Sequence, residues 1–110
     1  MIADRVRAFF AAFLRADRAA FEEMLTDDFT FTSPYDDHID RAAYFETCWP
    51  SAGTFVHHDI DQSVAEGDTC FVVYWGQARN GSRFRNTELF RLDGDRVRSV
   101  EVFFGRPADS

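Results

Sequence analysis

Apolar side chains recur every three or four positions at the start of the chain, which predicts an amphipathic helix over about residues 3–16. Asp17 stands where it can cap a short second helix, and Asp40 stands where it can cap a third helix over residues 41–49. The apolar positions of all three predicted helices fall on one side of each helix. They therefore predict a helical layer that covers one face of another element.

The rest of the chain alternates polar and apolar residues with the period of a strand. A short run, Phe29–Thr32, predicts one strand, and residues 35–39 after it predict a loop. Four long strands are predicted over residues 55–66, 69–79, 82–92 and 97–104. Three helices and a meander of long strands predict an α+β fold, with the helices packed on a curved antiparallel sheet that forms a cone around an internal cavity.

The pair Asn80-Gly81 predicts the turn between the second and third long strands. A two-residue type I′ turn needs positive φ at both positions, which this pair tolerates well. The resulting register predicts one shared sheet face for three facing pairs: Trp75 with Asn86, Val73 with Glu88, and Phe71 with Phe90. The other face of the third strand carries arginines, so the face with Glu88 is predicted to be buried.

A buried glutamate is costly unless it is paired, hydrogen-bonded or kept neutral by a raised pKa. Glu88 is therefore a candidate catalytic acid or ligand-binding group, with a structural carboxyl bonded to a core Tyr, Trp or backbone amide as the alternative. His58 lies among apolar residues on its own strand, where an imidazole of near-neutral pKa could exchange a proton with Glu88 or a ligand. A core histidine bonded to a backbone carbonyl is the other interpretation.

Composition limits the function classes. The 110 residues predict a single domain, residues 1–110, and 13 Phe, 3 Tyr and 2 Trp supply enough aromatic surface to line a cavity. A net charge of −7 without a basic patch argues against nucleic-acid binding. No apolar run is long enough for a membrane span or a signal peptide, so a cytoplasmic protein is expected. Cys48 and Cys70 lack metal or redox spacing, and no metal site or cofactor motif is predicted.

Three segments carry a resemblance to a known group of proteins. They are Leu25-Thr-Asp-Asp-Phe-Thr-Phe-Thr-Ser-Pro34, Ile39-Asp-Arg-Ala-Ala-Tyr-Phe45 and Leu92-Asp-Gly-Asp-Arg-Val97. With the order of predicted elements, they resemble the nuclear transport factor 2-like superfamily, and within it the SnoaL-like and ketosteroid isomerase-like branch. The resemblance covers nearly the whole chain and implies a cone fold with a ligand cavity. It does not imply one reaction, because this superfamily hosts isomerases, cyclases, hydrolases and non-catalytic dimers.

The ketosteroid isomerase pattern can be compared residue by residue. That family places an aspartate base before the proline that follows the first strand, where this chain has Ser33. Its oxyanion tyrosine on the first helix corresponds to Phe9, and its protonated aspartate on the strand before the last corresponds to Glu88. The resemblance therefore implies a cavity position for Glu88 and argues against the isomerase reaction itself.

The last strand allows two registers. Its more uniformly apolar set faces inward in the preferred one, which leaves Glu101 outside, whereas the alternative register would put Glu101 beside Glu88. The outer sheet face is predicted to hold a homodimer interface made of Tyr74, Leu89 and Phe103. The predicted pocket lining, besides Glu88 and His58, is Phe9, Ser33, Tyr35, Trp49, Phe71, Val73, Trp75, Asn86, Phe90, Val102 and Phe104.

The favoured hypothesis is a protein that binds a small hydrophobic organic molecule carrying a carbonyl or hydroxyl, as a cofactor-independent lyase, isomerase or cyclase. In it, Glu88 is the acid or hydrogen-bond donor and His58 its partner. A non-catalytic ligand-binding module and a dimeric interaction domain with a filled core are the two alternatives.

Overall fold

The computed structural model of the chain describes residues 2–107. The helices are α1 (Ile2–Leu14), α2 (Arg18–Glu23) and α3 (Arg41–Thr47), and a short 3₁₀ helix, η1 (Trp49–Ser51), follows α3. The strands are β1 (Leu25–Ser33), β2 (Asp36–Asp40), β3 (Phe55–Glu66), β4 (Thr69–Ala78), β5 (Arg83–Asp93) and β6 (Arg96–Pro107). None of the helices in this described part is long and apolar enough to cross a membrane.

Both predicted helix caps are confirmed. The Asp17 carboxylate accepts a hydrogen bond from the Ala20 backbone N–H at 3.2 Å, and the Asp40 carboxylate accepts one from Ala43 N–H at 2.9 Å. Each cap satisfies a backbone donor that the first helical turn leaves without a partner. The two aspartates thereby fix where α2 and α3 begin.

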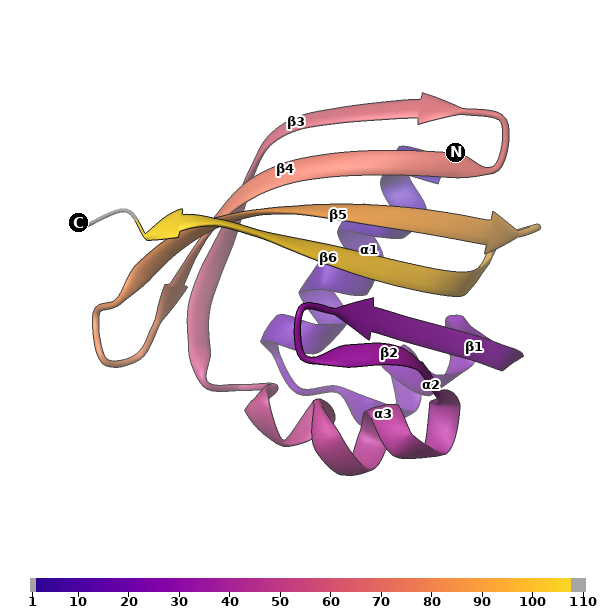
Figure 1. Cartoon of the computed structure of the whole chain (residues 1–110), viewed down its shortest axis with the longest axis horizontal. Coiled ribbons are helices and arrows are strands. Elements are labelled where there is room, and N and C mark those ends of the chain that lie inside the picture. Colours follow the sequence, from indigo (N-terminus) through magenta and orange to yellow (C-terminus); the bar gives the residue numbers. More distant parts are fainter. Residues whose placement is uncertain (1, 108–110) are drawn as a thin grey trace.

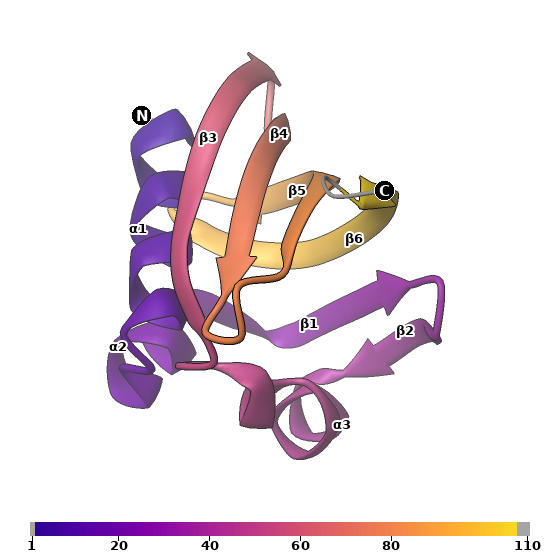
Figure 2. The same cartoon turned by 90° about the vertical axis from the view of Figure 1, so that its left-hand side faces the viewer.

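The six strands form one curved sheet in the order β2-β1-β6-β5-β4-β3. Figures 1 and 2 show its long strands bending around α1, with α3 near β1 and β2. The predicted α+β cone is confirmed. The sheet is mixed rather than wholly antiparallel, because β1 and β6 pair in parallel. A strand's own polar–apolar pattern carries no information about the direction of a partner from the other end of the chain.

The segment predicted as a loop after Ser33 is a strand. Within it, β2 pairs with β1 through Thr30 opposite Asp40 and Phe31 opposite Ile39. The sequence of β2 has one apolar residue among five, so it shows no alternation to detect. Pairing with β1 rather than burial stabilises this strand, and it carries Asp36 to the edge of the interior.

The turn between β4 and β5 differs from the predicted two-residue turn. The Ala78 N–H donates to Ser82 O at 2.9 Å, and the Gly81 N–H donates to Ala78 O at 3.0 Å. The loop therefore has three residues, with Gly81 at a φ of 91°. Three-residue hairpin loops of this kind place a left-handed residue after a tight turn. The extra loop residue shifts β4 by one position against β5.

A shift of one residue turns every β4 side chain to the opposite face. Cys70, Val72 and Tyr74 point inward and are buried. The predicted orientation of the β5 side chains is correct, because it follows from the alternation of polar and apolar residues within β5 itself. Tyr74 thus faces Asn86, and Val72 faces Glu88, on the interior side of the sheet.

Aromatic rings pack between α1 and part of the sheet. Phe21, Phe29 and Phe90 are fully buried. The Phe9 ring centroid lies 4.5 Å from that of Phe21 and 5.2 Å from that of Phe90. Tilted and edge-on contacts at such distances are favourable for aromatic pairs beyond the area they bury. These rings hold α1 against β5.

Gly76 provides a local test of this packing. It lies opposite Phe84 on β5, and a Cβ at Gly76 would overlap the Phe84 ring. We expect Gly76→Ala to push that ring toward the interior and to lower the free energy of unfolding by roughly 1 to 2 kcal/mol. Urea unfolding would measure this loss. Gly67→Ala is an unsuitable control because Gly67 has positive φ, so Ala65→Gly on the exposed edge strand serves instead. An unchanged unfolding free energy in Gly76→Ala would contradict the tight fit.

Candidate functional site

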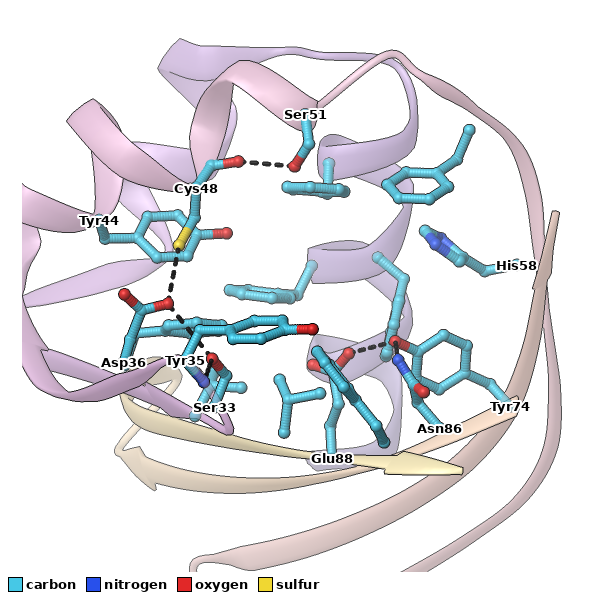
Figure 3. Close-up of a pocket in the computed structure, with 18 of the residues that line it drawn as sticks. Ser33, Tyr35, Asp36, Tyr44, Cys48, Ser51, His58, Tyr74, Asn86 and Glu88 are labelled. Atoms are coloured by element: carbon cyan, nitrogen blue, oxygen red, sulfur yellow. Dashed lines mark hydrogen bonds between the residues drawn. The ribbon is translucent and has the colours of Figure 1, made fainter. Parts of the chain in front are cut away.

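A cavity of about 460 Å³ lies inside the cone, between α1 and the inner sheet face. Seven phenylalanines and three tyrosines are among the residues that line it. Its polar groups come mainly from β2, α3, β4 and β5, and Figure 3 shows them arranged around the interior. An apolar cavity with a few convergent polar groups is the usual form of a small-molecule site.

Most of the predicted pocket residues line this cavity. They are Phe9, Ser33, Tyr35, His58, Asn86, Glu88, Val102 and Phe104. Trp49 and Phe90 are not among its lining residues. Trp49 packs on Phe13 and Phe21 behind the cavity wall, and Phe90 is fully buried beside Phe9.

Three of the predicted lining residues, Phe71, Val73 and Trp75, lie on the outer face of the sheet. The prediction for them was wrong because the longer turn shifts β4 by one residue. Phe71 is 45 % exposed. Trp75 is shielded there by two arginines, with the guanidinium carbons of Arg83 and Arg85 at 5.3 and 4.9 Å from its ring centroid. Cation–π contacts of this kind stabilise an aromatic ring on an exposed face.

The same shift overturns the prediction that Tyr74 lies on the outer face. Tyr74 is 4 % exposed and points into the cavity. Leu89 and Glu101 pair with each other on the outer face, and Val102 lies opposite Glu88. The register that would put Glu101 beside Glu88 is therefore excluded.

Glu88 is the acidic centre of the cavity. The Tyr74 hydroxyl donates a short hydrogen bond to Glu88 Oε2, and Asn86 Nδ2 donates to the Tyr74 hydroxyl at 3.4 Å. Burial raises the pKa of Glu88 to about 7, and the hydrogen bond from Tyr74 opposes that rise. A carboxyl group with a pKa near neutrality can both take and give a proton, which suits a general acid–base group.

Tyr44 reaches the cavity from α3. Its hydroxyl has no side-chain hydrogen bond among the described residues, and the side chain is 4 % exposed. Burial, followed by the negative charge of Glu88, raises the pKa of Tyr44 well above its ordinary value. The phenol therefore stays protonated and can donate a hydrogen bond to a bound molecule.

His58 lines the cavity but is not a near-neutral acid. Burial, followed by the charge of the nearby His57, lowers its pKa to about 4, and Asp59 opposes this fall. Its ring lies 5.3 Å from the rings of both Phe10 and Tyr74, and its Nδ1 is buried with no hydrogen-bond partner among the described residues. The imidazole is thus neutral at neutral pH. This corrects the expectation of a pKa near neutrality.

A second set of polar residues lies at the β2 end of the cavity. Ser33 Oγ donates to Asp36 Oδ2 at 3.2 Å, and Cys48 Sγ lies 4.0 Å from the same oxygen. Burial raises the pKa of the Cys48 thiol to about 11, and the negative charge of Asp36 adds to that rise. Cys48 is therefore an inert thiol, and Asp36 is the charged member of this corner. In Figure 3 the corner lies on the other side of the cavity from Tyr74 and Asn86.

Among the lining residues outside the predicted set are Tyr74, Tyr44 and Asp36. Tyr74 was placed on the wrong face by the turn. Tyr44 lies on the predicted third helix, but helical spacing does not reveal that its hydroxyl meets a cavity. Asp36 lies in the segment predicted as a loop, and only the pairing of β2 with β1 brings its carboxylate to the lining.

The role of Tyr74 can be tested by Tyr74→Phe. Its hydroxyl stabilises the ionised form of Glu88, so its removal should raise the pKa of Glu88 above its present value of about 7. A titration followed by the carboxyl carbon resonance of Glu88 would measure the shift. Tyr35→Phe is the control, because Tyr35 is 84 % exposed at the cavity mouth and should leave this pKa unchanged. A lower pKa in Tyr74→Phe would contradict the assigned hydrogen bond.

Comparisons with known proteins agree with this architecture. A family model described as a SnoaL-like domain matches residues 6–100. A search of curated proteins found no significant match to this sequence. Among solved structures, an NTF2-like protein of unknown function from Cytophaga hutchinsonii is similar, with a TM-score of 0.77 at 20% identity over 96% of this chain and 90% of that one.

Two further structures of similar fold have activities in their names. A proposed polyketide cyclase from Sinorhizobium meliloti has a TM-score of 0.74 at 22% identity and covers 91% of this chain and 94% of that chain. An LEH-like epoxide hydrolase of M. tuberculosis has a TM-score of 0.77 at 17% identity, over 94% of this chain and 82% of that one. At such low identity these similarities show a shared fold.

Proposed function

We propose that this protein, which belongs to the SnoaL-like domain family, binds a hydrophobic carbonyl compound in its cavity and uses Glu88 to transfer a proton beside the carbonyl group. The observation that carries this proposal is a buried carboxyl group, hydrogen-bonded to Tyr74, inside an aromatic cavity. Its burial raises its pKa to about 7. The polyketide cyclase and epoxide hydrolase of similar fold support a catalytic use of such a cavity.

The proposed step is proton abstraction from the carbon next to a ligand carbonyl. The ionised Glu88 carboxylate takes the proton, and the electron pair of the broken C–H bond forms a C=C bond while the carbonyl π electrons move to oxygen. The Tyr44 hydroxyl then donates a hydrogen bond to that oxygen. Such donors stabilise charge that develops on an enolate. In a ligand with a C=C bond next to that carbon, return of the proton from Glu88 to the far alkene carbon restores the C=O bond and shifts the double bond, which gives isomerisation. In a ligand with a second carbonyl group, attack of the enolate carbon on that carbonyl carbon restores the first C=O bond, and the proton held by Glu88 goes to the second carbonyl oxygen, which gives cyclisation.

His58 has a separate part in this proposal. At a pKa of about 4 the imidazole is uncharged near pH 7 and is not a general acid, so it is a neutral partner that orients the ligand by hydrogen bonding. Glu88 alone then cycles between its protonated and ionised forms. A pKa close to the working pH favours this double use of one group.

Binding of aryl alkyl ketones tests the proposed ligand class. A ketone held at about 100 times its dissociation constant should raise the free energy of unfolding by about 2.7 kcal/mol, which a thermal-shift measurement detects readily. The matched hydrocarbon, without the oxygen, should bind more weakly. If the ketones bind no more tightly than the hydrocarbons, carbonyl recognition is wrong.

A non-catalytic binding module is the second candidate. The observation in its favour is that Ser33 and Phe9 line the cavity where the ketosteroid isomerase pattern has its base and its oxyanion tyrosine. In this case the ketones bind but their α-protons do not exchange. The two candidates thus differ in one measurable reaction.

We also propose a cytoplasmic homodimer. Both cysteines are free, as expected in a reducing compartment. The outer sheet face exposes Phe71 and Phe103 at 45 % and 46 %, with Leu89 beside them on β5. Apolar side chains gathered on one face favour association, and a two-fold dimer is the commonest form.

Phe103→Asp tests the homodimer. A charge on this face should raise the dimer dissociation constant at least about tenfold, because an interface core excludes unpaired charge. Light scattering across a concentration series would measure this. Val56→Asp is the control, since Val56 is exposed to a similar extent, at 46 %, on the edge strand β3. A monomeric wild type would rule out the proposed dimer.

A further inference from the structure

Asp36 brings a carboxylate to the lining of the cavity. Its Oδ2 accepts the hydrogen bond from Ser33 and faces the Cys48 thiol. Its Oδ1 has no hydrogen-bond partner among the described residues, although the side chain is only half-exposed and lines the cavity. The Ser33 hydroxyl is itself oriented, because it accepts a hydrogen bond from the Tyr35 backbone N–H at 3.1 Å. Ser33 therefore holds the carboxylate in place, and the carboxylate keeps lone pairs for a further hydrogen bond.

The ionisable side chains that can carry charge at neutral pH in the cavity lining are all acidic. Its lining contains two carboxyl groups, Asp36 and Glu88, and within the described residues neither Arg nor Lys contributes to it. His58 is neutral at neutral pH. An anionic ligand would meet no positive partner there and would be repelled by Asp36. The cavity therefore discriminates against carboxylates and phosphates.

The walls of the cavity suit a positive charge. Tyr44 and Phe31 are neighbours with ring centroids 5.0 Å apart, and both line the cavity on the side of β1 and α3. Tyr35 and Phe104 pair at 5.5 Å on the lining as well. Aromatic faces attract ammonium groups, most strongly where the cation has lost its water. A carboxylate beside aromatic rings is a suitable site for a protonated amine.

We propose that the ligand is an amine-bearing hydrophobic ketone, whose protonated amine binds the Asp36 carboxylate among the aromatic rings while the carbon next to its carbonyl group lies at Glu88. This rests on the function proposed above and narrows its ligand class. A neutral hydroxyl could also donate to Asp36, but a charged donor forms the stronger hydrogen bond with a carboxylate. Glu88 is the less suitable partner for the amine because it is buried and already accepts a hydrogen bond from Tyr74.

Three probes of one shape test this inference. They are dimethylaminobutyrophenone, the same ketone with an isopropyl group in place of the dimethylamino group, and benzoylbutyrate, which ends in a carboxylate. Calorimetry at neutral pH gives their dissociation constants. We expect the amine to bind at least about tenfold more tightly than its isopropyl isostere, as one charge-assisted hydrogen bond allows, and the carboxylate to bind more weakly than both.

Asp36→Asn tests whether the preference for the amine over its isostere depends on Asp36. It keeps the shape of the side chain and should reduce the affinity for the amine to that for the isostere. Asp37→Asn, which changes the net charge equally on a neighbour outside the cavity lining, should keep the preference. Equal binding of amine and isostere by the wild type overturns the inference and leaves the proposed function standing. A preference that persists in Asp36→Asn also overturns it. Failure of all three ketones to bind overturns the proposed function, and this inference with it.

Discussion

Glu88→Gln should lower the rate of α-proton exchange on a bound aryl ketone by at least about 100-fold, the usual contribution of a general base. Glutamine keeps the size of the side chain and can still accept the hydrogen bond from Tyr74, but it cannot take a proton. Exchange in deuterated water, followed by the loss of the α-proton signal in NMR spectra, measures the reaction with no need to know the natural substrate.

The matched control for this experiment is Glu101→Gln. Glu101 is the same residue type on the neighbouring strand β6, but it lies on the outer face opposite Leu89. Its replacement changes the net charge by the same amount and should leave the exchange rate unchanged. Unchanged exchange in Glu88→Gln, with the ketone still bound, would remove Glu88 from the reaction.

The second large effect concerns stability and pH. The pKa of Glu88 is about 7 in the folded protein, against 4.5 for an ordinary glutamate. The folded state therefore holds this proton more tightly than the unfolded state does. The resulting stabilisation is complete below pH 4.5 and is lost as the pH rises through 7. Over that range Glu88 should remove roughly 3 kcal/mol from the free energy of unfolding.

His58 acts in the opposite direction. Its pKa is lowered from 6.5 to about 4, so its contribution is present above pH 6.5 and is lost as the pH falls through 4. The two effects overlap and flatten the pH dependence of the wild type. When one of the two groups is removed, the free energy of unfolding should change with pH as the remaining group alone dictates.

Urea unfolding from pH 4.5 to 8 separates the contributions of Glu88 and His58 to the free energy of unfolding. Glu88→Gln should become more stable relative to the wild type as the pH rises, whereas His58→Gln should become less stable relative to the wild type over the same range. Glu101→Gln serves again as the control and should follow the wild-type curve. If the curves of Glu88→Gln and the wild type run parallel, Glu88 has the same pKa in the folded and unfolded states, and the account of its burial is wrong.

Much of the fold could be predicted because each element carries its own pattern. The amphipathic spacing of α1 and the capping aspartates of α2 and α3 are local signals, and the structure contains them as predicted. The resemblance to the SnoaL-like branch is confirmed by the family model over residues 6–100. The parallel pairing of β1 with β6 could not be predicted, because it depends on contacts between the two ends of the chain.

Only part of the site could be predicted from the sequence. The main error arose because the turn between β4 and β5 is one residue longer than predicted. Glu88 and Asn86 were placed inward by the alternation of β5 itself, so the error in the turn did not affect them. The predicted orientation of the β4 side chains depended on the register across the turn, so the inner and outer sets of β4 residues were interchanged. Tyr74, the hydrogen-bond partner of Glu88, was lost in that exchange. A hydrophobic pattern specifies which face of a strand is buried only when its two faces differ, and both faces of β4 carry large apolar side chains.

The central claim is that Glu88 is a cavity carboxyl group that titrates near neutrality. The most direct test is a pH titration of the carboxyl carbon resonance of Glu88, assigned from its absence in Glu88→Gln, with and without a bound aryl ketone. We predict a midpoint near pH 7 in the free protein and a change in that midpoint when the ketone binds. A midpoint near 4.5, unmoved by the ketone, would contradict the account.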